Sequence, residues 1–266
     1  MEITFVQLLV FGTVAGLANV LGGLILFPPG IHKNYKKLLK YILALGAGFM
    51  LSVTFVNIIP EVVEIWATPG RSISEALVAP MMLLLGGYML TQFFEHTIAP
   101  HFHLGEEVHP DHLISVSSAY TAVGGLLIHT FFDGVSIAAA AMVDERVGIL
   151  VFIAIFLHKF PEGFTIASMV LAAGKGFKPV MIATSLVGLT TLLGVLFFHF
   201  IGTTIGFTVA YALPLASGVT LYVAASDLIP EVNHHGGKRP LVSMSVFAGV
   251  ALFFLTHILL GMIMGE

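Results

Sequence analysis

Two histidine–carboxylate pairs have the residue types and spacing for metal chemistry. His129 precedes Asp133 by four residues, and His158 precedes Glu162 by four. Residues four apart share one face of a helix, so each pair presents an imidazole beside a carboxylate. These donors suit a borderline divalent cation such as Zn²⁺, Fe²⁺ or Mn²⁺. We therefore predict that the four side chains are metal ligands; the alternative is two local hydrogen bonds that hold helices together.

Both pairs belong to internal repeats. Residues 129–138 and 158–167 share the pattern H-x-F-x-[D/E]-G-x-[S/T]-I-A, and residues 59–62 recur as I-P-E-V at 229–232. Each copy falls on a helix that we expect to run opposite to its counterpart, so the repeats are inverted. Inverted repeats are typical of transporters, which open one site alternately to two sides.

The elements that position these residues must lie in a membrane. Hydrophobic residues make up 57% of the 266 and charged ones 10%, against about a quarter charged in soluble domains. We expect an all-α integral membrane protein, with residues 1–266 forming a single transporter domain. The apolar runs predict eight spanning helices, at about 3–27, 38–60, 76–98, 113–142, 147–173, 178–201, 205–231 and 240–264.

Charge excludes some partners and suggests an orientation. A net charge of −4 leaves no basic surface for a nucleic acid, so the lipid bilayer is the expected large partner. The chain has no cysteine, so thiolate ligands are excluded. Eight cations fall in loops on one side and two on the other, and the positive-inside rule then places both termini outside the cytoplasm. The eight are Lys33, Lys36, Lys37, Lys40, Lys175, Lys178, Lys238 and Arg239; the two are Arg71 and Arg146.

The segment 3–27 is preceded by Glu2 rather than by a basic stretch, and it is a full span long. We therefore expect it to stay in the mature protein rather than act as a cleaved signal. A plasma membrane, the inner membrane in a bacterium, is the expected location.

Two residues near the predicted site are open to two interpretations. Lys159 follows His158 inside a span, where its ammonium could pair with Asp133 or Glu162 in a salt-bridging or gating role, or be structural. Met50 offers a soft thioether ligand, although methionine more often packs in the core.

Polar residues near the helix ends suggest a path for ions. Carboxylates at the outer end of the second span would gather cations, and a second set near the cytoplasmic end of the seventh span would form an exit; solvated helix ends are the alternative. The outer set is Asn57, Glu61 and Glu64, and the exit set is Asp227, Glu231, His234 and His235.

The predicted cytoplasmic loop 95–112 is rich in histidine. It combines five histidines with four carboxylates, a composition expected of a weak cation collector. The histidines are His96, His101, His103, His109 and His112.

With these features, the chain resembles the ZIP (Zrt/Irt-like) family of divalent metal transporters over essentially its whole length. The resemblance rests on eight spans, the histidine-rich loop between spans 3 and 4, and the paired motifs of spans 4 and 5. It implies uptake of Zn²⁺, Fe²⁺, Mn²⁺, Cd²⁺ or related ions toward the cytoplasm, with zinc as the default. It further implies ligation by His129, Asp133, His158 and Glu162, raises the expectation for Met50, and suggests a homodimer in which spans 1, 4, 5 and 6 slide against 2, 3, 7 and 8.

The chain also departs from that family. Members with two adjacent metal ions carry an amide or a carboxylate where this sequence has Thr130 and Lys159, and a Glu about where Thr191 stands. We therefore expect one ion, with Lys159 replacing the second electrostatically.

The leading hypothesis is transport of a divalent metal, in which the ion is the substrate and no catalytic cofactor is needed. Because neutral imidazole is the ligand form, this hypothesis predicts that transport activity falls as the histidines protonate, near about pH 6.5. An intramembrane zinc hydrolase is a second hypothesis, although the sequence has no H-E-x-x-H motif. A proton-coupled transporter of another cation is the third.

Overall fold

The structure is a computed structural model that describes residues 3–27, 31–67, 72–97, 116–202, 204, 208–236 and 240–264. Within these ranges the side chains of residues 31–39, 75, 117, 118, 122, 172, 231, 234–236 and 264 lie outside the description.

The described residues are helical almost throughout, and eight of the helical segments are long and apolar enough to cross a membrane. This confirms the expected fold class. In chain order the elements are α1 (Phe5–Leu24), α2 (Ile31–Ser52), η1 (Val53–Ile58), α3 (Ile59–Trp66), α4 (Ile73–Thr97), α5 (Val116–Val143) and α6 (Glu145–Ala172). They continue with α7 (Phe177–Phe197), η2 (Phe198–Gly202), α8 (Val209–Tyr222), η3 (Val223–Leu228), α9 (Ile229–Gly236) and α10 (Pro240–Met264).

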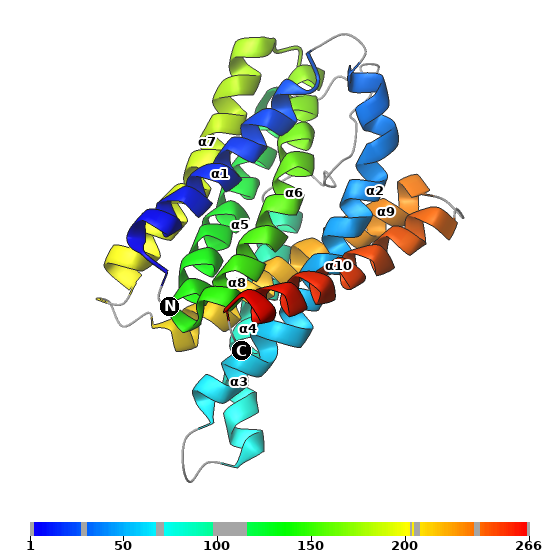
Figure 1. The fold of residues 1–266 in the computed structure, drawn as a ribbon. Helices are drawn as coiled ribbons and strands as arrows, with labels where there is room; N and C mark the ends of the chain where they lie inside the picture. The colour runs from blue at the N-terminus through cyan, green and yellow to red at the C-terminus, as the bar shows by residue number, and fades with distance from the viewer. Residues whose placement is uncertain are drawn as a thin grey trace.

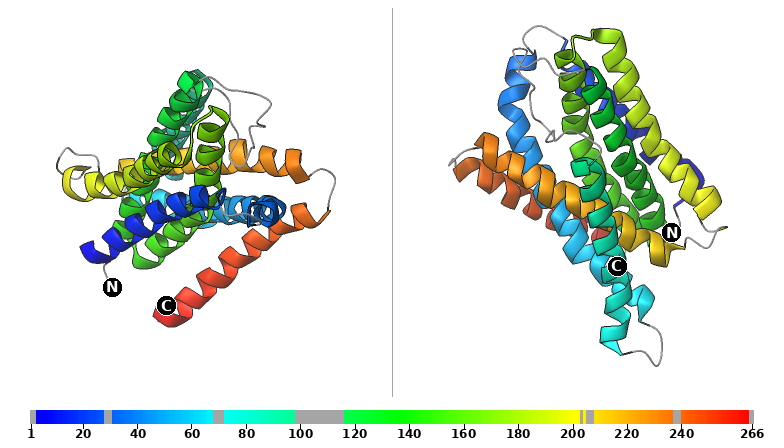
Figure 2. Two further views of the ribbon diagram at one scale, coloured as in Figure 1. Left: turned by 90° about the horizontal axis from the view of Figure 1, so that it is seen from above. Right: turned by 180° about the vertical axis from the view of Figure 1, so that it is seen from behind.

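The helices form two groups. In the first, α1, α5, α6 and α7 run side by side and pack on one another (Figure 1). In the second, α2 packs along α10 and α4 along α8. Of these helices, α8 and α10 run obliquely to the first group (Figure 1 and Figure 2). The groups meet where α5 packs on α8 and α2 packs on α6. The helices that carry the predicted ligands, α5 and α6, therefore lie at the junction of the two groups.

Close backbone contacts show that the first group is built from two inverted halves. Gly16 of α1 and Gly188 of α7 pack backbone against backbone: a Cβ on Gly16 would lie 2.6 Å from the Gly188 carbonyl oxygen, and the reverse distance is 2.5 Å. Each helix also packs a second glycine, six residues further on, against the equivalent phenylalanine carbonyl of a motif helix. These contacts join Gly22 to Phe160 of α6 and Gly194 to Phe131 of α5.

The second group repeats the same symmetry. Gly48 of α2 packs on the carbonyl of Val246 in α10, and Gly218 of α8 packs on that of Leu84 in α4. The inverted repeat therefore extends beyond the two motifs seen in the sequence and includes every spanning segment that the structure describes.

A π-helix precedes each copy of the I-P-E-V repeat. In η1 the Ile59 N–H donates to the carbonyl of Thr54, five residues back, and in η3 the Ile229 N–H donates to that of Ala224. The proline that follows each isoleucine has no N–H and crowds the carbonyl four residues back, and a wide turn relieves this conflict. The helix of the second span consequently continues through η1 to Trp66.

The Gly16 contact yields a test of this packing. Replacing Gly16 with alanine forces α1 and α7 apart, because the new Cβ meets backbone rather than a movable side chain. We expect Gly16→Ala to lower stability by about 1–3 kcal/mol, measured as thermal unfolding in detergent. Gly124→Ala is the matched control, because a Cβ there meets nothing within 4 Å. Equal unfolding temperatures for the two variants would contradict the α1–α7 contact.

Candidate metal site

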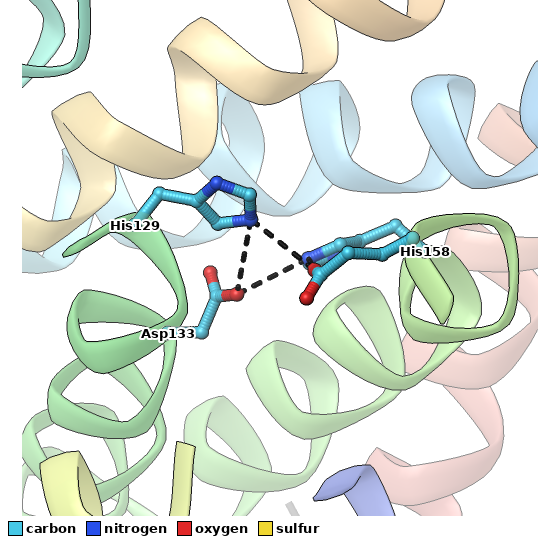
Figure 3. Close-up of side chains that lie close together, drawn as sticks. His129, Asp133 and His158 are labelled. Atoms are coloured by element: carbon cyan, nitrogen blue, oxygen red, sulfur yellow. Dashed lines mark hydrogen bonds and ion pairs between the residues drawn. The ribbon is translucent and has the colours of Figure 1, made fainter. Parts of the chain in front are cut away.

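The two motifs bring four ligand groups together between α5 and α6, at the junction of the two helix groups. His129 and Asp133 of α5 face His158 and Glu162 of α6, and one ligand atom from each lies within 4.8 Å of the others. Figure 3 shows His129, Asp133 and His158 pointing into one shared space. All four side chains are at most 1% exposed. The structure therefore joins the four predicted ligands in one buried cluster.

The distances within the cluster approach those of a metal coordination shell. His158 Nε2 lies 3.2 Å from Asp133 Oδ2, and His129 Nε2 lies 3.2 Å from Glu162 Oε2. The within-helix pairs, His129 to Asp133 and His158 to Glu162, are each 3.9 Å apart. A tetrahedral zinc site with bonds of about 2.0 Å has edges of about 3.3 Å. Small side-chain movements would thus close these four atoms around one ion.

Lys159 occupies the side of the cluster between the carboxylates. Its Nζ is 2.8 Å from Asp133 Oδ2 and 2.7 Å from Glu162 Oε2, so it bridges both rather than pairing with one. These are the same two oxygens that the imidazoles contact. The Lys159 side chain is fully buried, and a lone buried charge would be costly. The ammonium and the two carboxylates therefore stabilise one another.

The second oxygen of Glu162 is held from outside the cluster. Asn19 of α1 donates from Nδ2 to Glu162 Oε1 over 2.7 Å, and Thr130 Oγ1 lies 3.2 Å from the same oxygen. Asn19 is fully buried. The sequence analysis missed it, although an amide in an otherwise apolar span was a signal that could have found it.

One further carboxylate approaches the site from α4. Glu95 Oε1 lies 3.7 Å from His129 Nδ1. The neighbouring His96 ring accepts or donates a hydrogen bond at 3.1 Å with the hydroxyl of Tyr222, which lies near the charges of Glu95 and Asp227. Asp227, predicted at the exit, is 7% exposed within η3. The end of α4 therefore places a carboxylate beside His129 and an imidazole beside Tyr222.

The residues predicted to capture ions lie on the π-helix η1 and on α3. Asn57 lies in η1, with an amide nitrogen that is buried and has no hydrogen-bond partner among the described residues. Glu61 is half-buried and Glu64 exposed, and the charges of Glu64 and Asp144 both act on Glu61. Glu61 and Glu64 therefore add negative charge to α3, and Asp144, the N-cap of α6, is near enough to act on Glu61.

Met50 and the remaining predicted residues are placed only in part. Met50 of α2 is fully buried in the apolar core, on a helix that packs against α6. Glu231, His234 and His235 lie along the α9 backbone, with side chains outside the description. Of the loop histidines only His96 is described, at the exposed end of α4; His101, His103, His109 and His112 lie outside the described residues.

Comparison with known proteins also relates this chain to metal transporters. A family model described as "ZIP Zinc transporter" matches residues 105–257. Zinc transporter ZIP9-B of Xenopus laevis is 29% identical over 161 residues, which are 58% of this chain and 52% of that protein. Zinc transporter ZIP10 of Mus musculus is 29% identical over 121 residues, 46% of this chain and 14% of that protein. The chain spans about half the length of the ZIP9 relatives that it matches.

The matched region contains all four clustered residues on α5 and α6. Because it extends over more than half of the 266 residues, the chain belongs to the ZIP zinc transporter family.

Proposed function

We propose that this protein transports divalent transition metal ions, zinc foremost, across a membrane toward the cytoplasm. The observation that carries the proposal is the convergence of His129, Asp133, His158 and Glu162 within 4.8 Å in a buried site. Nitrogen and carboxylate ligands without sulfur from cysteine suit Zn²⁺, and also accommodate Fe²⁺, Mn²⁺ and Cd²⁺. The four residues are the proposed ligands, with Met50 as a soft ligand reaching from α2.

The site binds one ion in this proposal. Lys159 already places a positive charge within 2.8 Å of each carboxylate, so a second divalent ion beside it would be repelled. The arriving ion shares Asp133 Oδ2 and Glu162 Oε2 with the ammonium. Between transport cycles the same ammonium compensates the two carboxylates in the absence of metal.

The ion's path follows the polar residues on either side of the site. Glu61 and Glu64 with Asn57 collect cations outside, and Asp227, Glu231, His234 and His235 release them inside, next to the loop 95–112. The grouping of α1, α5, α6 and α7 supports a sliding movement of that group against the second. A homodimer would pack through the second group, where the α4 and α10 spans are each only 17% buried.

Ion flux tests the proposal directly. We expect proteoliposomes with the unaltered protein to take up Zn²⁺. Glu162→Ala should abolish the uptake because it removes one of the four ligands, which is also one of the two carboxylates that Lys159 bridges. Lys178→Ala, an exposed position on α7, is the control and should transport normally. Absence of flux for Zn²⁺, Fe²⁺, Mn²⁺ and Cd²⁺ in the folded, unaltered protein would contradict the proposal.

Removing the ammonium tests the role of Lys159. Without metal, Lys159→Met leaves two buried carboxylates without the ammonium that bridges them, and we expect a loss of about 3–5 kcal/mol in stability. Added Zn²⁺ should restore more stability to this variant than to the unaltered protein, because the ion supplies the missing charge. Thermal unfolding in chelator and in Zn²⁺ measures both effects. An unchanged unfolding temperature in chelator would rule out charge compensation.

The absence of native cysteine makes orientation testable. The proposed topology places Ser72, exposed before α4, outside and Lys178, exposed on α7, in the cytoplasm. In intact cells, a membrane-impermeant thiol reagent should therefore label Ser72→Cys but not Lys178→Cys, and lysis should expose the latter. The reverse labelling pattern would invert the topology.

A further inference from the structure

The two carboxylates of the cluster differ in how their outer oxygens are held. Glu162 Oε1 accepts the Asn19 amide hydrogen bond at 2.7 Å. Asp133 Oδ1 is equally buried but has no hydrogen-bond partner among the described residues. The outer oxygen of Glu162 is therefore held by a hydrogen bond, whereas that of Asp133 is not held by any described residue.

Asn19 is the effective anchor of Glu162. Thr130 Oγ1 also lies near Glu162 Oε1, at 3.2 Å, but it is closer to the Leu126 carbonyl, at 2.6 Å. A hydroxyl carries one hydrogen, and it is committed to the shorter contact. Among the described residues, the Asn19 amide nitrogen donates to one acceptor, Glu162 Oε1. The amide is held in place because the Asn19 backbone carbonyl packs directly on Gly163, the residue after Glu162.

The inverted repeat supplies an internal comparison for Asn19. Residues 16–22 read G-L-A-N-V-L-G and residues 188–194 read G-L-T-T-L-L-G, which places Thr191 at the position equivalent to Asn19. The Thr191 carbonyl packs on Gly134, the residue after Asp133, just as Asn19 packs on Gly163. The Thr191 hydroxyl is buried and has no hydrogen-bond partner among the described residues. The two halves therefore share their backbone arrangement and differ in the donor offered to the carboxylate.

We propose that Asn19 is a positioning residue that holds Glu162 by its outer oxygen, so that the inner oxygen always faces the ion. This inference rests on the proposed metal site and adds a residue to it from α1. Asp133, which lacks an equivalent donor, is the carboxylate that reorients as the ion binds and leaves. A hydrogen bond to a buried charged group is among the stronger ones in proteins, so its loss should weaken ion binding by about tenfold.

The test is equilibrium Zn²⁺ binding by the purified full chain in detergent, measured against a chromophoric chelator. Asn19→Thr introduces the residue that the equivalent position already accommodates, and should bind Zn²⁺ about tenfold more weakly. Thr191→Val is the matched control at the equivalent, equally buried position, and its affinity should change by less than about twofold. Unchanged affinity in Asn19→Thr, or equal losses in both variants, would overturn the inference.

A double-mutant cycle separates positioning from general packing. Glu162→Asp keeps the charge but withdraws the carboxylate from Asn19. In that background, Asn19→Thr should therefore lower the Zn²⁺ affinity by less than a further factor of about two. If the loss of Zn²⁺ affinity in the double variant equals the product of the losses in the two single variants, Asn19 acts on the fold and not through Glu162. That result would overturn the inference. If Asn19→Thr fails to fold, Thr191→Asn replaces it: a new donor beside Asp133 should tighten Zn²⁺ binding severalfold, and no change would overturn the inference.

Failure of the proposed function would look different. It would appear as no saturable Zn²⁺ binding by the unaltered protein, whereas failure of the inference alone leaves that binding intact.

Discussion

The compensation of two buried carboxylates is the constraint on which the rest of this structure depends. Asp133 and Glu162 are fully buried in membrane-spanning helices, where each charge costs about 2.5–3.5 kcal/mol even on a permissive insertion scale. They are tolerated because Lys159 bridges them and two imidazoles lie within 3.2 Å of their oxygens. An arrangement that binds one fixed cation well is also suited to receive a mobile one.

Close helix packing makes this arrangement possible. Glycines at Gly16, Gly22, Gly188 and Gly194 bring α1 and α7 into backbone contact with each other and with the site helices. In lipid, association of helices depends on such packing rather than on the hydrophobic effect. The same contacts bring the Asn19 amide to Glu162. The glycine contacts that pack the first helix group therefore also set the geometry of the ion site.

The sequence predicted the four clustered residues because their spacing and inverted recurrence are both visible in it. Spacing fixes which residues share a face of their own helix, and a repeated polar face must meet its counterpart. The fold class followed from apolar run length, and the structure confirms it. For Lys159 the sequence left two roles open, a salt bridge to Asp133 or Glu162 and a structural role, and it did not indicate that the ammonium would bridge both carboxylates.

Other features were not predictable from local pattern. Asn19 lies 143 residues from Glu162 in the chain, and no periodicity in α1 indicates which helix its amide faces. The repeat of residues 16–22 at 188–194 is short, and the residues that it shares are only glycine and leucine, which are frequent throughout this chain. It acquires meaning only once Gly16 and Gly188 are seen in contact. The π-helices η1 and η3 depend on how each proline is accommodated, which the I-P-E-V pattern alone does not specify.

The central claim is that His129, Asp133, His158 and Glu162 together hold one transported ion. Zinc K-edge X-ray absorption on the protein loaded with Zn²⁺ and freed of excess metal tests it most directly. The account predicts one zinc ion per chain with two imidazoles in a mixed nitrogen and oxygen shell, and with one imidazole fewer in His158→Ala. Two ions per chain, or a shell without imidazole, would contradict it.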